Sequence, residues 1–278
     1  MSTPLKIILV CDDKERSMSI AGILDGFADI HVAGKYNLDN SYSAANFLEV
    51  QAICLDLHQT PVKALSTLAT LVDRFPKITC WVCAPELEPE IVRTAFRLGA
   101  VEFFHAYTMK EEIPQALMRL QNRRPRYQIQ PSKKDKRNSS IQTLLVSDGD
   151  SIRIKKIEGL LRQRKNLYFM ATVPVDEALE RMRLMRPRLV WIDLAPEPDR
   201  CLPLIESTRD LLPSANVMVS YDHPDPVLVK KAYNLGAADF LDPERWKIDL
   251  PAALASMQPE AKGDKTWWSL VRKLLGSS

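Results

Sequence analysis

Short apolar runs alternate with amphipathic stretches along the first 121 residues of the chain. Runs such as Leu5–Val10 are apolar at almost every position, which is typical of strands covered on both faces of a sheet. The stretches between the runs repeat apolar residues at helical spacing. The predicted strands are Leu5–Val10, Asp29–Ala33, Ala52–Leu57, Ile78–Cys83 and Val101–His105. The predicted helices are Ser17–Phe27, Val62–Phe75, Pro89–Leu98 and Glu111–Arg123, with Pro114 in the first turn of the last one.

Residues 141–258 repeat this alternation, and the Leu-Gly-Ala triplet of residues 98–100 recurs at residues 235–237. The predicted strands are Thr143–Val146, Leu167–Thr172, Leu189–Leu194, Val217–Val219 and Asp239–Leu241. The predicted helices are Ile152–Leu161, Val175–Met185, Leu202–Leu211, Val227–Leu235 and Leu250–Met257. We therefore predict an internal duplication with a period of about 137 residues. The alternation implies right-handed crossovers, so the expected fold is α/β, with two tandem doubly wound (βα)5 domains.

Composition and charge define the domain organisation further. The 278 residues suffice for two domains, predicted at residues 1–121 and 141–258. Residues 122–140 carry seven Lys and Arg but one Asp, so we predict a basic flexible linker there. Because this linker has no helical pattern, it does not favour nucleic-acid binding. No apolar stretch is long enough to cross a membrane and the start lacks a secretory pattern, so we expect a cytoplasmic protein.

The five cysteines are odd in number, and three of them lie in apolar runs, which fits reduced thiols. Cys80 and Cys83 have the C-x-x-C spacing of redox pairs, but they fall in a predicted strand. Residues three apart in a strand point to opposite faces, so we expect two buried strand cysteines rather than a redox pair.

Acidic residues follow the first and third strands of each half. They are Asp12, Asp13 and Asp56 in the first half and Asp148, Asp150 and Asp193 in the second. In an open parallel sheet, the carboxyl ends of these neighbouring strands meet near the topological switch point. We therefore expect each set to form a shared acidic pocket suited to Mg²⁺. The alternative for any one of these residues is a helix cap or a turn.

These carboxylates, their spacing and the Leu-Gly-Ala triplets resemble the response-regulator receiver family, the CheY-like domains, twice over. The resemblance covers residues 5–121 and 141–258 and implies a flavodoxin/CheY-like strand order of 2-1-3-4-5. It implies that acidic residues bind Mg²⁺ and that Asp56 or Asp193 accepts a phosphoryl group. The separations of 44 residues from Asp12 to Asp56 and 45 from Asp148 to Asp193 match the family.

Both units depart from the family at the positions that handle the phosphoryl group. Where the family has its first acidic residue, these units have Cys11 and Ser147, with Asp13 and Asp150 as substitutes nearby. The Thr or Ser switch position is Cys83 in one unit and Ser220 in the other. The lysine position falls on Ala106, or on His105 with a slip of one residue, and on Asp242.

Loss of the lysine removes the charge that compensates a transferred phosphoryl group, and Asp242 would repel that group. We therefore expect two pseudo-receivers that form a non-catalytic signalling regulator or adaptor. No cofactor is required, with Mg²⁺ in a residual acidic pocket as an open option. The alternatives are a phosphorylatable receiver or phosphorelay protein that uses Asp193 or Asp56, or a localisation module. The four histidines have no partner motif, so turnover of a small molecule is not expected.

Expected partners are proteins, such as a signalling kinase, an output protein, pilus or motility machinery, or a second copy of the chain. By resemblance, the contact face comprises the fourth helix, fifth strand and fifth helix, at Val92–Leu117 and Val229–Leu254.

The tail, residues 259–278, contains a predicted amphipathic helix at residues 266–275. It carries Trp268 and an apolar face of Trp267, Leu270, Val271, Leu274 and Leu275. So short a helix must dock to be stable. It would dock on the second domain, on a partner's groove or on a membrane surface.

Overall fold

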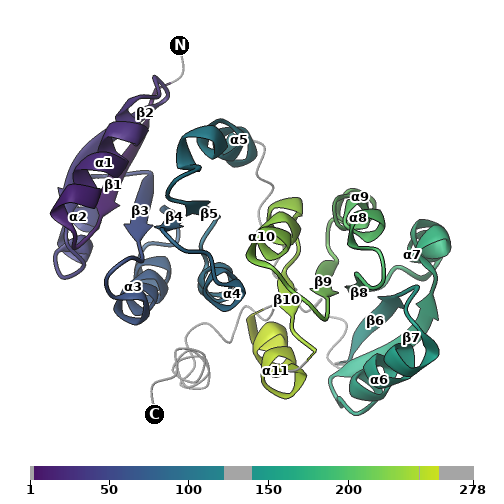
Figure 1. The fold of residues 1–278 in the computed structure, drawn as a ribbon. Coiled ribbons are helices and arrows are strands. Elements are labelled where there is room, and N and C mark those ends of the chain that lie inside the picture. The colour runs from purple at the N-terminus through teal and green to yellow at the C-terminus, as the bar shows by residue number, and fades with distance from the viewer. Residues whose placement is uncertain (1–2, 122–139, 244, 257–278) are drawn as a thin grey trace. The chain divides into compact units, whose positions relative to one another are not determined.

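The computed structural model describes residues 3–121, 140–243 and 245–256. These residues form two compact units, each built around its own five-stranded sheet (Figure 1). The predicted linker and the predicted C-terminal helix fall mainly on residues 122–139 and 257–278, which lie outside the described residues. In the described part of the chain, no helix is long and apolar enough to span a bilayer.

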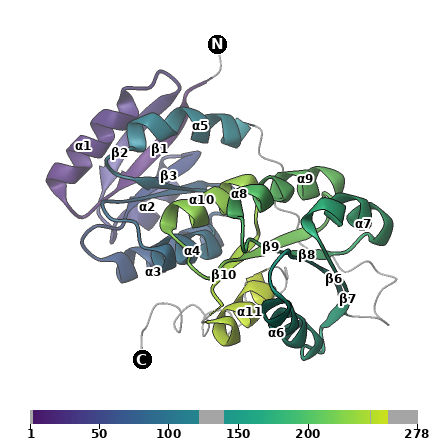
Figure 2. The same cartoon turned by 45° about the vertical axis from the view of Figure 1, so that its right-hand side comes forward.

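The first unit has five parallel strands in the order β2-β1-β3-β4-β5. The strands are β1 (Leu5–Val10), β2 (Ile30–Tyr36), β3 (Ala52–Asp56), β4 (Thr79–Ala84) and β5 (Glu102–His105). The helices are α1 (Lys14–Asp25), α2 (Ser41–Phe47), α3 (Pro61–Arg74), α4 (Pro89–Leu98) and α5 (Met109–Gln121). Figure 2 shows α1 and α5 on one face of this sheet and α3 and α4 on the other.

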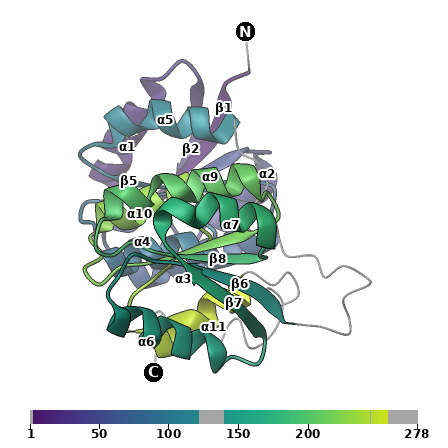
Figure 3. The ribbon, with the colours of Figure 1, turned by 90° about the vertical axis from the view of Figure 1, so that its right-hand side faces the viewer.

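The second unit has the same arrangement, with the order β7-β6-β8-β9-β10. Its strands are β6 (Ile141–Val146), β7 (Leu167–Val173), β8 (Leu189–Asp193), β9 (Asn216–Ser220) and β10 (Asp239–Leu241). Its helices are α6 (Ser151–Arg162), α7 (Ala178–Met185), α8 (Pro198–Cys201), α9 (Pro203–Leu211), α10 (Pro226–Leu235) and α11 (Trp246–Ser256), and the 3-10 helix η2 (Val175–Glu177) precedes α7. Figure 3 shows α6 and α11 on one face of the sheet and α7, α9 and α10 on the other.

Both sheets therefore have the order 2-1-3-4-5, counted along each unit, with helices on both faces. This order confirms the expected doubly wound fold, in which the crevice beyond the carboxyl ends of the strands is the usual place for a site. The apolar runs of the sequence become the central strands, and every residue of β3 and β8 is buried.

Backbone irregularities also repeat between the two units. The pairing of the first two strands shifts register between Ile7 and Ile8 in one unit and between Thr143 and Leu144 in the other. The α4 helix ends at Gly99 with φ of 107°, and α10 ends at Gly236 with φ of 106°. Positive φ values favour glycine, because a side chain is strained there. The duplication thus extends to details of the backbone that the apolar pattern alone does not specify.

In the two cores, a tryptophan and a smaller residue occupy the same pair of neighbouring strand positions, but in opposite order. Cys54 on β3 lies beside Trp81 on β4, whereas in the second unit Trp191 on β8 lies beside Met218 on β9. All four residues are completely buried. Each pair joins one tryptophan to a smaller residue, so the packed volume of the pair stays similar while the tryptophan changes strand.

Several predicted boundaries were wrong. The α2 helix was not predicted, because its sequence SYSAANF lacks a strong apolar stripe. The α5 helix begins at Met109, which is fully buried, so Pro114 lies inside the helix rather than in its first turn. The predicted helix Leu202–Leu211 matches α9 to within one residue, and the short helix α8 before it was not predicted. The last helix of the second unit begins at Trp246, four residues before the predicted start.

Candidate functional site

The two predicted phospho-acceptors end the third strand of each unit. Asp56 ends β3 in register with Cys83 on β4, and Asp193 ends β8 in register with Ser220 on β9. Both carboxylates are buried, with side-chain exposures of 2% for Asp56 and 0% for Asp193. The predicted acceptor and switch positions are therefore neighbours in both units. A carboxylate buried this deeply needs a counter-charge or several hydrogen bonds.

In the first unit, an arginine that the sequence reading overlooked supplies this counter-charge. Arg16 is the third residue of α1, and its backbone N–H donates to the side chain of the N-cap residue Asp13 at 3.0 Å. Its side chain reaches across to Asp56 with two parallel hydrogen bonds, from Nε to Oδ2 at 3.0 Å and from Nη2 to Oδ1 at 2.6 Å. The hydrogen bonds to Asp56 are the largest cause that raises the pKa of Arg16.

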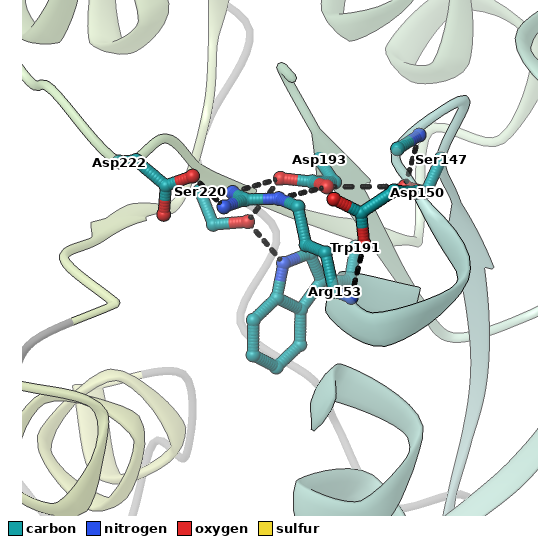
Figure 4. A network of polar contacts seen from close by, with 8 residues as sticks. Ser147, Asp150, Arg153, Trp191, Asp193, Ser220 and Asp222 are labelled. Atoms are coloured by element: carbon teal, nitrogen blue, oxygen red, sulfur yellow. Dashed lines mark hydrogen bonds and ion pairs between the residues drawn. The ribbon is translucent and has the colours of Figure 1, made fainter. Parts of the chain in front are cut away.

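The second unit repeats this pair at positions 137 residues further along (Figure 4). Asp150 caps α6 and accepts from the backbone N–H of Arg153 at 2.8 Å. The guanidinium donates to Asp193 from Nε to Oδ2 at 2.6 Å and from Nη2 to Oδ1 at 2.5 Å. Its third nitrogen, Nη1, pairs with Asp222 in the loop after β9. Burial lowers the pKa of Arg153, but its bonds to Asp193 and Asp222 outweigh this effect and raise the pKa overall.

In both units, the first acidic residue after the first strand hydrogen-bonds to the backbone of the segment that follows the second strand. Asp12 Oδ1 accepts from the backbone N–H of Leu38 at 2.8 Å. Asp148 Oδ1 accepts from the backbone N–H of Val175 at 3.0 Å. Each carboxylate thus ties the loop after the first strand to the segment after the second strand. The second acidic residues, Asp13 and Asp150, are helix N-caps, which was the alternative prediction from the sequence.

A second cation lies in the first turn of the helix after the third strand in each unit. Lys63, the third residue of α3, pairs with Asp39 at 2.8 Å. Arg200, the third residue of α8, pairs with Asp176 at 2.7 Å and with Asp148 at 2.8 Å.

The remaining contacts of the two acceptors differ between the units. In the first unit the neighbours are thiols, with Cys11 Sγ 3.2 Å from Asp56 Oδ2 and Cys83 Sγ 3.7 Å from Oδ1. Burial and then the charge of Asp56 raise the pKa of Cys11 to about 12. The contact with Cys54, whose Sγ lies 4.0 Å away, and burial raise the pKa of Cys83 well above its ordinary value. These thiols are therefore protonated at neutral pH and act as weak donors.

In the second unit the neighbours are hydroxyls. Ser147 and Ser220 each donate to Asp193, to Oδ2 and Oδ1 respectively, at 3.0 Å. Ser220 also accepts from the Nε1–H of Trp191 at 2.9 Å, so the core fixes the orientation of this hydroxyl (Figure 4). Gly149 passes so close that a Cβ there would lie 3.3 Å from Asp193 Oδ2.

The cysteines follow the strand interpretation. All five are buried and free. Cys83 lies in the same core cluster as Cys54 and Trp81, whereas Cys80 lies on the other face of β4. Cys80 and Cys83 therefore point to opposite faces of the strand, as residues three apart in a strand do.

The lysine positions of the resemblance fall after the fifth strand of each unit. Ala106 follows β5 and donates its N–H to Ala84 at 2.8 Å, and His105 ends β5 with its ring 5.2 Å from that of Tyr107. Asp242 follows β10 and donates its N–H to Asp249 at 3.4 Å.

The donors at these strand ends do not fit Mg²⁺. Within the described ranges, no three His, Cys, Asp or Glu side chains gather in a way that could hold a metal ion. In both units the two oxygens of the acceptor carboxylate are taken by a guanidinium. Where the resemblance places a first acidic residue, Cys11 has a protonated thiol and Ser147 a hydroxyl, and Mg²⁺ prefers carboxylate oxygen.

No family model and no curated protein matches the chain. Solved structures of response-regulator receivers are similar in part. The signal receiver domain of NarL from Mycobacterium tuberculosis has 15% identity and a TM-score of 0.40, over 44% of this chain and 100% of that one. The response regulator domain of CheB from Thermotoga maritima has 19% identity and a TM-score of 0.39, over 44% and 99%. RcsB from Salmonella typhimurium has 12% identity and a TM-score of 0.42, over 77% and 95%. At such identities the likeness concerns the fold alone, and the strand order already establishes that fold.

Proposed function

We propose that this chain is a signalling regulator or adaptor without catalytic activity, whose two receiver-like units act through protein–protein interaction. The observation that carries the proposal is that, in each unit, one arginine forms a bidentate ion pair with the carboxylate of the predicted phospho-acceptor. A carboxylate that accepts phosphate must present one oxygen as the nucleophile, in line with the leaving group. Here both oxygens of Asp56 and Asp193 are engaged in charge-assisted bonds.

Releasing the arginine is costly. A buried carboxylate that loses its partner is left uncompensated, at a cost of about 3–5 kcal/mol. In the second unit the release would also separate Arg153 from Asp222. Ser220 is held between Asp193 and Trp191, so it is not free to move toward a phosphoryl group. These features support a closed switch in both units.

Treatment of the whole protein with acetyl phosphate and Mg²⁺, followed by intact mass measurement, tests the proposal. We expect no phosphoryl adduct, while a receiver domain treated in parallel gains one. A stoichiometric adduct mapped to Asp193 or Asp56 contradicts the proposal and favours the alternative, a phosphorylatable receiver or relay protein.

The adaptor role predicts protein partners, for which a kinase, an output protein, pilus or motility machinery and a second copy of the chain are the candidates. The basic segment 122–140 does not favour nucleic acid as the partner. The localisation alternative rests on the predicted helix 266–275. Deletion of residues 264–278 and tracking of the protein in cells distinguishes it, because an adaptor that does not need the tail keeps its distribution.

A further inference from the structure

We infer that side-chain cations, Arg153 with Arg200 in the second unit and Arg16 in the first, permanently take the place of a divalent cation at the strand ends. The inference rests on the proposed function and explains how each cleft is neutralised.

The positions of the four cations match. Arg16 and Arg153 are third residues of the helix after the first strand, and Lys63 and Arg200 are third residues of the helix after the third strand. Each pair of equivalents is 137 residues apart, and the change from Lys63 to Arg200 preserves the charge. The neutral groups that contact the paired carboxylate do differ, with a thiol on Asp56 and a hydroxyl on Asp193.

The charges also balance. A divalent ion at these strand ends would bridge the acceptor carboxylate and the carboxylate after the first strand. In the second unit, Arg153 neutralises the first of these, Asp193, and Arg200 neutralises the second, Asp148, at 2.8 Å. In the first unit, Arg16 holds Asp56. Lys63, the equivalent of Arg200, pairs with Asp39 instead.

Geometry separates the two carboxylates that a metal would join. Mg²⁺ needs near-octahedral oxygen ligands at about 2.0–2.1 Å from one point. Asp12 and Asp148 instead point to the backbone N–H groups of Leu38 and Val175, while Asp56 and Asp193 point to their arginines. In the second unit, two fixed single charges on two separate carboxylates thus replace one shared double charge.

The consequence is a metal-independent cleft in the native chain and a latent metal site beneath the cations. Removal of both cations from the second unit, R153M/R200M, frees Asp148 Oδ2 and Asp193 from the guanidinium groups that hold them, so that an ion can contact both. The matched control R153M/D193N removes the Arg153 guanidinium together with the carboxylate it holds. Arg162→Met, in α6 and away from the strand ends, controls for the loss of an arginine.

Titration of full-length proteins with Mn²⁺, followed by the resonance signal of free Mn²⁺, tests the inference. We expect no stoichiometric site in the native protein, R153M/D193N or R162M. We expect one site in R153M/R200M, at least about tenfold tighter than any binding to R153M/D193N. If R153M/R200M is unfolded in metal-free buffer, the inference requires millimolar Mg²⁺ to restore its circular dichroism.

A stoichiometric Mn²⁺ site in the native protein overturns the inference, as does a folded R153M/R200M that gains no site or an unfolded one that Mg²⁺ does not rescue. These outcomes are separate from failure of the proposed function. That failure is read as a phosphoryl adduct on the native protein, which the metal titration does not measure.

Discussion

The ion pair between Arg153 and Asp193 leads to a specific prediction for the variant Arg153→Met. Asp193 is completely buried and Arg153 is 10% exposed, so solvent screens this pair little. The variant leaves the carboxylate with two hydroxyl donors and no counter-charge, which costs about 3–5 kcal/mol. That is a large part of the roughly 5–15 kcal/mol that stabilises a typical domain. For a unit of this size the loss corresponds to a fall in Tm of about 10–20 °C.

Arg162→Met is the matched control, since it makes the same substitution in the same helix. Arg162 is 62% exposed and lies 3.8 Å from Glu158 one turn away. An exposed pair of this kind contributes about 0–0.5 kcal/mol. The two variants therefore separate the loss of a buried counter-charge from the loss of an arginine side chain on α6.

Hydrogen exchange followed by mass spectrometry reads each unit separately, which suits a chain whose two units need not unfold together. We expect faster exchange in β6 and β8 of R153M and unchanged exchange in the strands of the first unit. The double variant R153M/D193N should recover at least half of the lost stability, because its buried group is uncharged. The reasoning is refuted if R153M exchanges like R162M, or if the double variant is no more stable than R153M.

Other predictions concern the backbone and the thiols. Gly99→Ala should destabilise the first unit by about 1–2 kcal/mol in urea unfolding, since φ is 107° and its Cβ would lie 2.7 Å from Val72 Cγ1. Gly159→Ala, inside α6 with nothing within 4 Å of its Cβ, should stabilise by about 0.5–1 kcal/mol. In native protein at pH 8, all five thiols should react slowly with a disulfide reagent, and all should react at once in denaturant. Burial raises the pKa of Cys201 from 9.0 to about 11, so its contribution to stability is complete below pH 9 and is lost as pH rises toward 11. Cys201→Ala should therefore flatten the decline in urea midpoint between pH 9 and 11, and an unchanged slope contradicts this assignment.

The fold could be predicted because its signals are local and occur twice. A run such as LVWIDL is apolar on both faces, so it predicts a central strand whatever surrounds it. Helix boundaries were predicted less well, since Met109 and Trp246 join their helices by packing against the sheet from outside the regular apolar pattern. The 2-1-3-4-5 order came from the resemblance, because periodicity does not specify which strands are neighbours.

The candidate site was predicted only at the strand ends. Asp56 and Asp193 could be placed there because a strand fixes the direction of its last residue. Arg16 and Arg153 were missed because an arginine in the first turn of a helix ordinarily lies in solvent, and its long side chain can reach partners that sequence spacing does not reveal. A signal was present in the repeat itself, where Asp-x-x-Arg occurs at Asp13–Arg16 and again at Asp150–Arg153.

The two units together indicate why the arginine accompanies the missing acid. Around the acceptor, Cys11 is exchanged for Ser147 and Cys83 for Ser220, while the guanidinium keeps its position. Neutral donors of either kind cannot balance a buried negative charge, so they are interchangeable, whereas the cation is not. A carboxylate at position 11 or 147 would help to attract a metal ion, and that ion would supply the charge. Without that carboxylate, the chain itself must supply it. The absence of an acidic residue at positions 11 and 147 and the presence of the arginine therefore bear on one electrostatic requirement, the neutralisation of the buried carboxylate.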